Sequence, residues 1–164
     1  MCWKKGELDA VISLASDILV YAEAHNLQYI ELVKIPKIFL FSASSEIGPS
    51  PAPVDFKDIP MLVISEKSVV NALQSNVDLC HKYGFQPHIV FKDSLDDVLF
   101  GVGLNEGFFI CDARFEPLML PHFRHLRLSD RHSVVLAWWK QNQNPALKPL
   151  IQCCTKAIQW PESL

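Results

Sequence analysis

The sequence of 164 residues is 49% hydrophobic and 20% charged, and its formal net charge is −3. These values are typical of a folded protein and exclude wholesale disorder, and the net negative charge supplies no cationic surface for nucleic acid. No apolar run is long enough to span a membrane, and Lys4, Lys5, Glu7 and Asp9 interrupt the region where a signal peptide needs an apolar core. The expected location is therefore the cytoplasm.

Short apolar segments predict strands at residues 8–14, 28–34, 37–42, 61–65, 88–92, 108–112, 123–128 and 133–140. Helices are predicted at residues 69–83, 94–106 and 145–159. The first of these helices carries one apolar stripe and is followed by Gly84, a typical helix stop. Because short strands alternate with amphipathic helices, the pattern predicts an α/β domain with a mostly parallel sheet. The prolines of residues 48–60 predict an irregular surface connector between two strands.

The last predicted strand and helix form a continuous motif. Residues 134–139 are an unbroken apolar run, which suits a strand covered on both faces. Asn144 is then placed to accept from the first free N–H groups of a helix, and Pro145 suits the first helical position. Beyond them an apolar stripe recurs at three- and four-residue steps, so one face of the helix is expected to dock on another surface: Leu147, Leu150, Ile151, Cys154 and Ile158.

Several residue clusters could suggest chemistry, but each has a simpler structural explanation. The glycines of residues 101–107 have neither the spacing nor the position of a phosphate-binding loop, and they predict a helix stop and a tight turn. The basic residues between His122 and Arg131 alternate in direction along a strand, which favours a solvated edge over a metal site. Asp96 and Asp97 suit the start of a helix. No nucleophile motif is present, so these patterns predict no catalytic residue, metal or cofactor.

The number and the surroundings of the cysteines indicate whether they form disulfides. There are five of them, an odd number, and several stand among apolar neighbours. Reduced core thiols are therefore favoured over a disulfide framework.

Five segments follow one another across nearly the whole chain: KKGELDAVI, PVDFKDIPMLVIS, a helix ending in KYGFQPHIVFKDS, GVGLNEGFFIC and VVLAWWKQNQNPALKPLI. Their order resembles that of the effector-binding domain of LysR-type transcriptional regulators. Each of them tolerates wide substitution, so the resemblance rests on their order and spacing. In that family the last segment is a strand and a docking helix that return the chain from the second lobe to the first.

The resemblance implies a fold similar to the type 2 periplasmic binding proteins, with two α/β lobes and a cleft crossed by two strands. Residues 1–34 and 131–164 would form an incomplete first lobe, and residues 35–130 would form the second. The opening strand, helix and strand of the first lobe are expected to be missing, as are the winged helix-turn-helix and linker helix. The expected role is small-molecule sensing, with DNA contacted only through that absent domain, and the homodimers and tetramers of the family are doubtful for this chain.

The resemblance also implies where an effector would bind. Polar contacts in such a cleft come from helix N-termini and from loops after parallel strands, which favour a polar or anionic small molecule. The matching positions here are Ser13, Ser65, Lys67, Ser68, Asp93 and Ser94. For each serine, helix capping is an alternative of about equal weight. Asp93 would disfavour a carboxylate ligand unless a cation such as Lys67 offsets its charge.

Two alternatives share this fold. A transport-type solute-binding protein would require export, for which the sequence offers no signal. An enzyme such as a prephenate dehydratase would require a threonine-arginine-phenylalanine motif, whereas the single threonine here, Thr155, lies on the final predicted helix without that motif.

Overall fold

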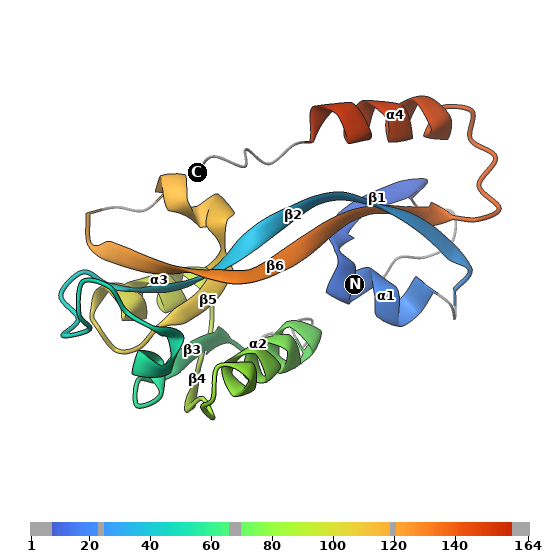
Figure 1. Cartoon of the computed structure of the whole chain (residues 1–164). Helices are drawn as coiled ribbons and strands as arrows, with labels where there is room; N and C mark the ends of the chain where they lie inside the picture. Colours follow the sequence, from blue (N-terminus) through green and yellow to red (C-terminus); the bar gives the residue numbers. More distant parts are fainter. Residues whose placement is uncertain (1–7, 23–24, 66–69, 119–120, 159–164) are drawn as a thin grey trace. The chain divides into compact units, whose positions relative to one another are not determined.

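The computed structural model of the chain describes residues 8–22, 25–65, 70–118 and 121–158. The chain divides into two compact units, which are described separately (Figure 1). Unit 1 comprises residues 1–35 and 131–164, and unit 2 comprises residues 36–130. The sequence-based boundaries were placed after residues 34 and 130. No helix in the described part of the chain is both long and apolar enough to cross a membrane.

In unit 1, strand β1 (Ala10–Leu14) pairs antiparallel with strand β6 (Phe123–Trp139). A helix that the sequence did not predict, α1 (Ala15–Ala22), follows β1 directly. Its buried Ile18 packs against Val135 and Ala137 of β6, which explains why these residues fold back as a helix. The last helix, α4 (Leu147–Ala157), has no buried residue, so within the described structure its apolar stripe is not covered as expected.

Strands β2 (Leu27–Ser42) and β6 are long and continuous, and each passes from one unit into the other. The amide of Lys140 donates to the Asn26 carbonyl near one end and the amide of Ala43 donates to the His122 carbonyl near the other, so the strands run antiparallel. The prediction of two shorter strands in each segment is wrong. Proline is compatible with extended backbone, and strand β5 (Phe109–Asp112) pairs with β2 only from Lys37 onward, so Pro36 does not interrupt β2.

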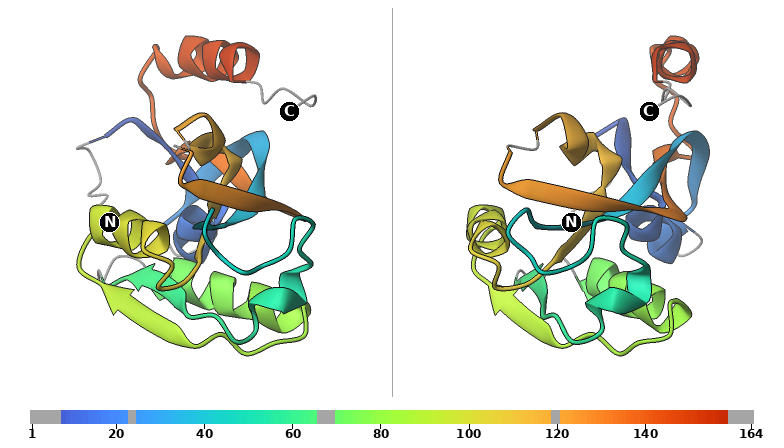
Figure 2. Two further views of the ribbon diagram at one scale, coloured as in Figure 1. Left: turned by 90° about the vertical axis from the view of Figure 1, so that its left-hand side faces the viewer. Right: turned by 60° about the vertical axis from the view of Figure 1, so that its left-hand side comes forward.

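Unit 2 is built from a parallel pair of strands, β3 (Met61–Ile64) and β4 (Ile89–Lys92), and an antiparallel strand, β5 (Phe109–Asp112), beside β2. Helix α2 (Val70–Lys82) follows β3, and helix α3 (Leu95–Gly103) follows β4. Two short 3-10 helices cover Pro53–Phe56 and Ala113–Leu118. Figure 2 shows α2 and α3 beside the β3–β4 pair.

The α/β class is confirmed, but the mostly parallel sheet is not. The larger sheet has the order β1-β6-β2-β5, and its described neighbours are antiparallel, whereas β3 and β4 form a separate parallel pair. The period of an apolar pattern reports which face of a strand is buried and does not report its direction, which is why the sequence missed this arrangement.

The core of unit 2 is aromatic. Phe39, Phe56 and Phe108 lie with ring centroids 5.0–5.1 Å apart, and none of the three is exposed. Phe56 comes from the proline-rich connector, where a 3-10 helix replaces the predicted irregular backbone. A side chain that is buried in this way fixes the connector to the domain.

Several local predictions can be compared directly with the structure. Gly84 has the left-handed φ of 87° expected at a helix stop, and residues 104–106 form the expected turn after α3. Helix α4 begins at Leu147, not at Pro145, and the Asn144 side chain instead accepts from the Ala146 amide in a turn before the helix.

Two predictions about side-chain surroundings need correction. Arg124 is not part of a solvated edge, because its guanidinium donates to the carbonyls of Ile47 and Gly48 and lies over the Phe41 ring. The four described cysteines form no disulfide, and Cys80 and Cys111 are buried as expected of core thiols. Cys153 is exposed, however, because it lies on α4, which has no buried residue.

Candidate functional site

The carboxyl ends of the parallel strands β3 and β4 bring three of the predicted site residues to one edge of unit 2. The two strands are in register, with Ile64 opposite Lys92, and the Ser65 amide donates to the Lys92 carbonyl at 2.9 Å. Asp93 and Ser94 follow Lys92 directly. In open α/β sheets, ligands are bound at the carboxyl ends of parallel strands, so this edge is the candidate site.

Ser94 is a helix cap in this structure. Its hydroxyl oxygen accepts from the Asp97 amide at 3.1 Å and donates to the Asp97 carboxylate at 2.6 Å. Both interactions stabilise the first turn of α3, so the capping alternative accounts for the position of this side chain. Ser65 and Asp93 are exposed beside it.

The other three predicted residues are not brought to this edge by the described structure. Ser13 belongs to β1 in unit 1, where its hydroxyl donates to the Asp17 carboxylate at 3.4 Å. Lys67 and Ser68 lie outside the described residues. The roles of all three stay predictions.

A cation at this edge was missed by the sequence analysis. The Lys92 ammonium forms an ion pair with the Glu106 carboxylate at 2.5 Å. The Lys92 side chain passes Gly101 of α3, where an added Cβ would lie 3.2 Å from Lys92 Cε. Glu106 is held at this position by the turn after α3, in which its amide donates to the Gly101 carbonyl. The pair therefore links β4 to the turn after α3. Because the two charges neutralise each other, the pair adds no net charge near Asp93.

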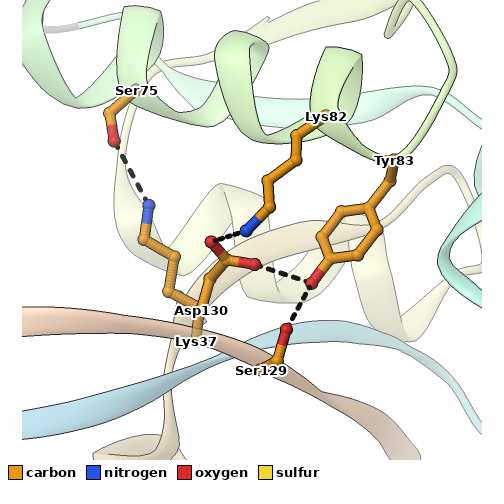
Figure 3. Close-up of polar contacts among 6 residues, drawn as sticks. All are labelled: Lys37, Ser75, Lys82, Tyr83, Ser129 and Asp130. Atoms are coloured by element: carbon orange, nitrogen blue, oxygen red, sulfur yellow. Dashed lines mark hydrogen bonds and ion pairs between the residues drawn. The ribbon is translucent and has the colours of Figure 1, made fainter.

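A second polar cluster lies between α2 and the strands β2 and β6 (Figure 3). Lys37 of β2 is only 6% exposed, and its ammonium donates to the Ser75 hydroxyl of α2 at 3.2 Å. Burial lowers the pKa of Lys37, although Asp130 and Cys80 oppose that change electrostatically. A buried ammonium whose described side-chain hydrogen bond is to a neutral hydroxyl is unusual, because a charge removed from water normally requires a charged partner.

Asp130 is the last residue of unit 2 and lies on β6. Its carboxylate binds two donors, Lys82 at the end of α2 and Tyr83 directly after it. It accepts from Lys82 at 2.6 Å and from the Tyr83 hydroxyl at 2.7 Å, and Tyr83 also lies 3.3 Å from the Ser129 hydroxyl. Burial opposes the ionisation of Asp130, yet the hydrogen bonds from Lys82 and Tyr83 outweigh it and lower the pKa of this carboxyl. The cluster thus ties the C-terminal end of α2 to β6.

The sequence itself carries a signal for this cluster. Lys37 is the one charged residue in the run from Ile35 to Ser42, and such a residue inside a buried strand requires a polar partner. No comparable signal marks a metal. Within the described part of the chain, no group of three His, Cys, Asp or Glu side chains could hold an ion.

Comparisons with known proteins identify the fold. No family model and no curated protein sequence matches the chain. Among solved structures, a full-length BenM variant matches with a TM-score of 0.76 at 15% identity, over 92% of this chain and 51% of that chain. HinK, a LysR-family regulator from Pseudomonas aeruginosa, matches with a TM-score of 0.74 at 18% identity, over 93% of this chain and 54% of that one.

The effector-binding domain of a BenM variant, solved by itself, matches with a TM-score of 0.72 at 15% identity. The match covers 92% of this chain and 71% of that domain. The chain therefore has the fold of a LysR-type effector-binding domain, as its sequence resemblance predicted. It spans about half the length of the full-length regulators that it matches.

Proposed function

We propose that this chain is the small-molecule-sensing domain of a LysR-type transcriptional regulator. The observation that carries the proposal is the structural match to such regulators over nearly the entire chain. The edge formed by Ser65, Asp93 and Ser94 supports it, because this is where α/β sheets of this kind offer loop and helix N–H groups to a ligand.

The expected ligand is a polar or anionic small molecule. Ser65 and Asp93 are exposed and available for contact, whereas Ser94 would have to share its hydroxyl with Asp97. Lys92 is paired with Glu106, so Lys67 remains the cation proposed to offset Asp93 for a carboxylate ligand. Ser13 and Ser68 complete the proposed contacts.

DNA binding is proposed to depend on a separate winged helix-turn-helix domain. The related regulator CbnR has been solved in complex with its target DNA. The present chain carries a net charge of −3, and nonspecific affinity for DNA comes mainly from cationic side chains. A mobility-shift titration of this chain with duplex DNA should therefore show no salt-sensitive, submicromolar complex.

Ligand binding can be tested by thermal shift and NMR titration with defined probes: benzoate, succinate, citrate, L-serine and glucose 6-phosphate. Ser65→Ala and Asp93→Asn should change the affinity of a binding probe about 3- to 10-fold, which corresponds to one hydrogen bond. Ser50→Ala, in an exposed loop, is the matched control. The proposal fails if no probe binds, or if binding is unchanged in both site variants.

A further inference from the structure

The buried Lys37 and the shared carboxylate of Asp130 belong to neighbouring strands that both leave unit 2 at this point. Lys37 is the second residue of the unit and Asp130 is its last. They are close enough to influence each other electrostatically, but the only side-chain hydrogen bond described for the ammonium is to Ser75. The carboxylate instead faces Lys82 and Tyr83 (Figure 3).

The alternative partners of Lys37 are few. Asp112 lies opposite Lys37 in the β2–β5 pairing, but its carboxylate is held by the Arg114 guanidinium at 2.6 and 2.8 Å. Cys80 is a buried thiol whose pKa burial raises to about 11, so it is neutral at physiological pH. Asp130 is thus the carboxylate that acts electrostatically on Lys37, and one of its present donors, Lys82, is an exposed and replaceable side chain.

Different interactions favour each of the two possible arrangements of Asp130. Pairing with Lys82 places the carboxylate near solvent, where an ion pair contributes little and is screened by salt. Pairing with Lys37 would satisfy a buried ammonium, where an opposite charge matters more because the surroundings are less polar. The first arrangement adds the hydrogen bond from Tyr83 to Asp130, and the second would give the Lys37 ammonium an oppositely charged partner.

We infer that Asp130 is a two-position switch, which binds Lys82 and Tyr83 in the described state and Lys37 in an alternative state. In the alternative state the C-terminal end of α2 loses the ion pair of Lys82 and the hydrogen bond of Tyr83 to Asp130 on β6. The 3.3 Å contact between the Tyr83 and Ser129 hydroxyls remains, together with local backbone bonds from the amides of Tyr83, Gly84 and Phe85 to carbonyls of residues 79–81. The switch couples the strands that leave unit 2 to the C-terminal end of α2, and it does not depend on the proposed effector.

The test uses the full chain and measures the pKa of Lys37 by NMR of its side-chain Cε and Hε nuclei. In Lys82→Met, Asp130 is released, and the pKa of Lys37 should rise by about one unit through the new ion pair. Removal of the positive charge of Lys82 would itself raise this pKa slightly by relief of repulsion. The same substitution in an Asp130→Asn background measures that contribution alone.

The expected result is a distinctly larger rise with Asp130 present than with asparagine in its place. Equal rises in the two backgrounds, or no rise, would overturn the switch. Lys57→Met, which removes an exposed lysine of unit 2, should leave the pKa of Lys37 unchanged.

A charge-neutral variant keeps the test decisive if Asp130→Asn does not fold. Tyr83→Phe removes one donor to Asp130 without altering any charge at neutral pH, so repulsion is unchanged. The switch predicts a higher pKa for Lys37 in this variant, together with faster hydrogen exchange at the amides of residues 83–85. A pKa for Lys37 equal to that of the wild type would refute it.

Discussion

Gly107 is the position at which the structure predicts the largest effect of adding a single methyl group. A Cβ at this residue would lie 2.3 Å from the Pro60 carbonyl oxygen and 2.9 Å from Leu62 Cδ2. The same Pro60 oxygen accepts from the Phe108 amide at 2.9 Å, and the Phe108 carbonyl accepts from Leu62. These bonds connect β3 to Phe108, the residue directly before β5.

The magnitude follows from what must move in Gly107→Ala. The Pro60 carbonyl must shift by roughly 1 Å to reach an ordinary carbon–oxygen contact, which breaks its bond with the Phe108 amide. Loss of a buried backbone hydrogen bond costs about 1–3 kcal/mol and overpacking costs about 1–3 kcal/mol, so a loss near 3–4 kcal/mol is expected. Phe108 is part of the aromatic core, so its displacement would extend the damage.

The assay is urea unfolding followed by circular dichroism, with two matched glycine variants. Gly48→Ala meets no atom within 4 Å and should lie within about 0.5 kcal/mol of the wild type. Gly84→Ala must adopt the left-handed φ of 87° and should lose about 1–2 kcal/mol. If Gly107→Ala were as stable as Gly48→Ala, the reasoning about this close approach would be wrong.

Three further outcomes are expected. Ser94→Ala removes the cap of α3 and should lower the free energy of unfolding by about 1 kcal/mol in the same assay, whereas Ser94→Thr, which keeps a hydroxyl that can both accept from and donate to Asp97, should retain most of it. Exposed Cys153 should react with iodoacetamide in the native chain, whereas Cys80, a buried thiol with a pKa raised to about 11, should react only after unfolding; mass spectrometry that shows equal labelling would contradict this. Burial lowers the pKa of Lys37 in the folded chain below its ordinary value of 10.5. Between these two values the unfolded chain binds more protons than the folded chain, so Lys37 makes the free energy of unfolding rise with pH in that window. Unfolding of Lys37→Met across pH should therefore show a flatter rise than the wild type, and parallel curves would exclude the effect.

The sequence was informative wherever a local rule determines the structure. The stripe of α2 and the glycine that follows it defined a helix and its end, because the left-handed conformation at Gly84 is easily adopted by glycine alone. The carboxyl ends of β3 and β4 likewise followed from two short, mainly apolar runs, the first succeeded by Ser65 and the second by Asp93 and Ser94. These features depend on neighbours in the chain, which a single sequence contains.

The remaining features depend on contacts between distant residues. Helix α1 is apolar on a stripe that could equally belong to a strand, and its type is decided by packing of Ile18 on β6. Arg124 was expected in solvent because a single sequence does not reveal that its partners are carbonyls of a loop far away along the chain. The Lys37 cluster joins residues of three separate elements, so its lone charged residue indicated a need for a partner but not which one.

The division of the chain also determines the order in which its parts can fold during synthesis. Unit 2 is one uninterrupted segment, whereas unit 1 requires residues from both of its segments, since Leu14 of β1 pairs with Val134 of β6. At about 5–20 residues per second, a ribosome makes Val134 roughly 6–24 s after Leu14. Throughout that interval β1 lacks its partner strand, while the residues of unit 2 are completed in between. The apolar segment around Ile12 therefore stays without its β6 partner on the ribosome until unit 2 has been made.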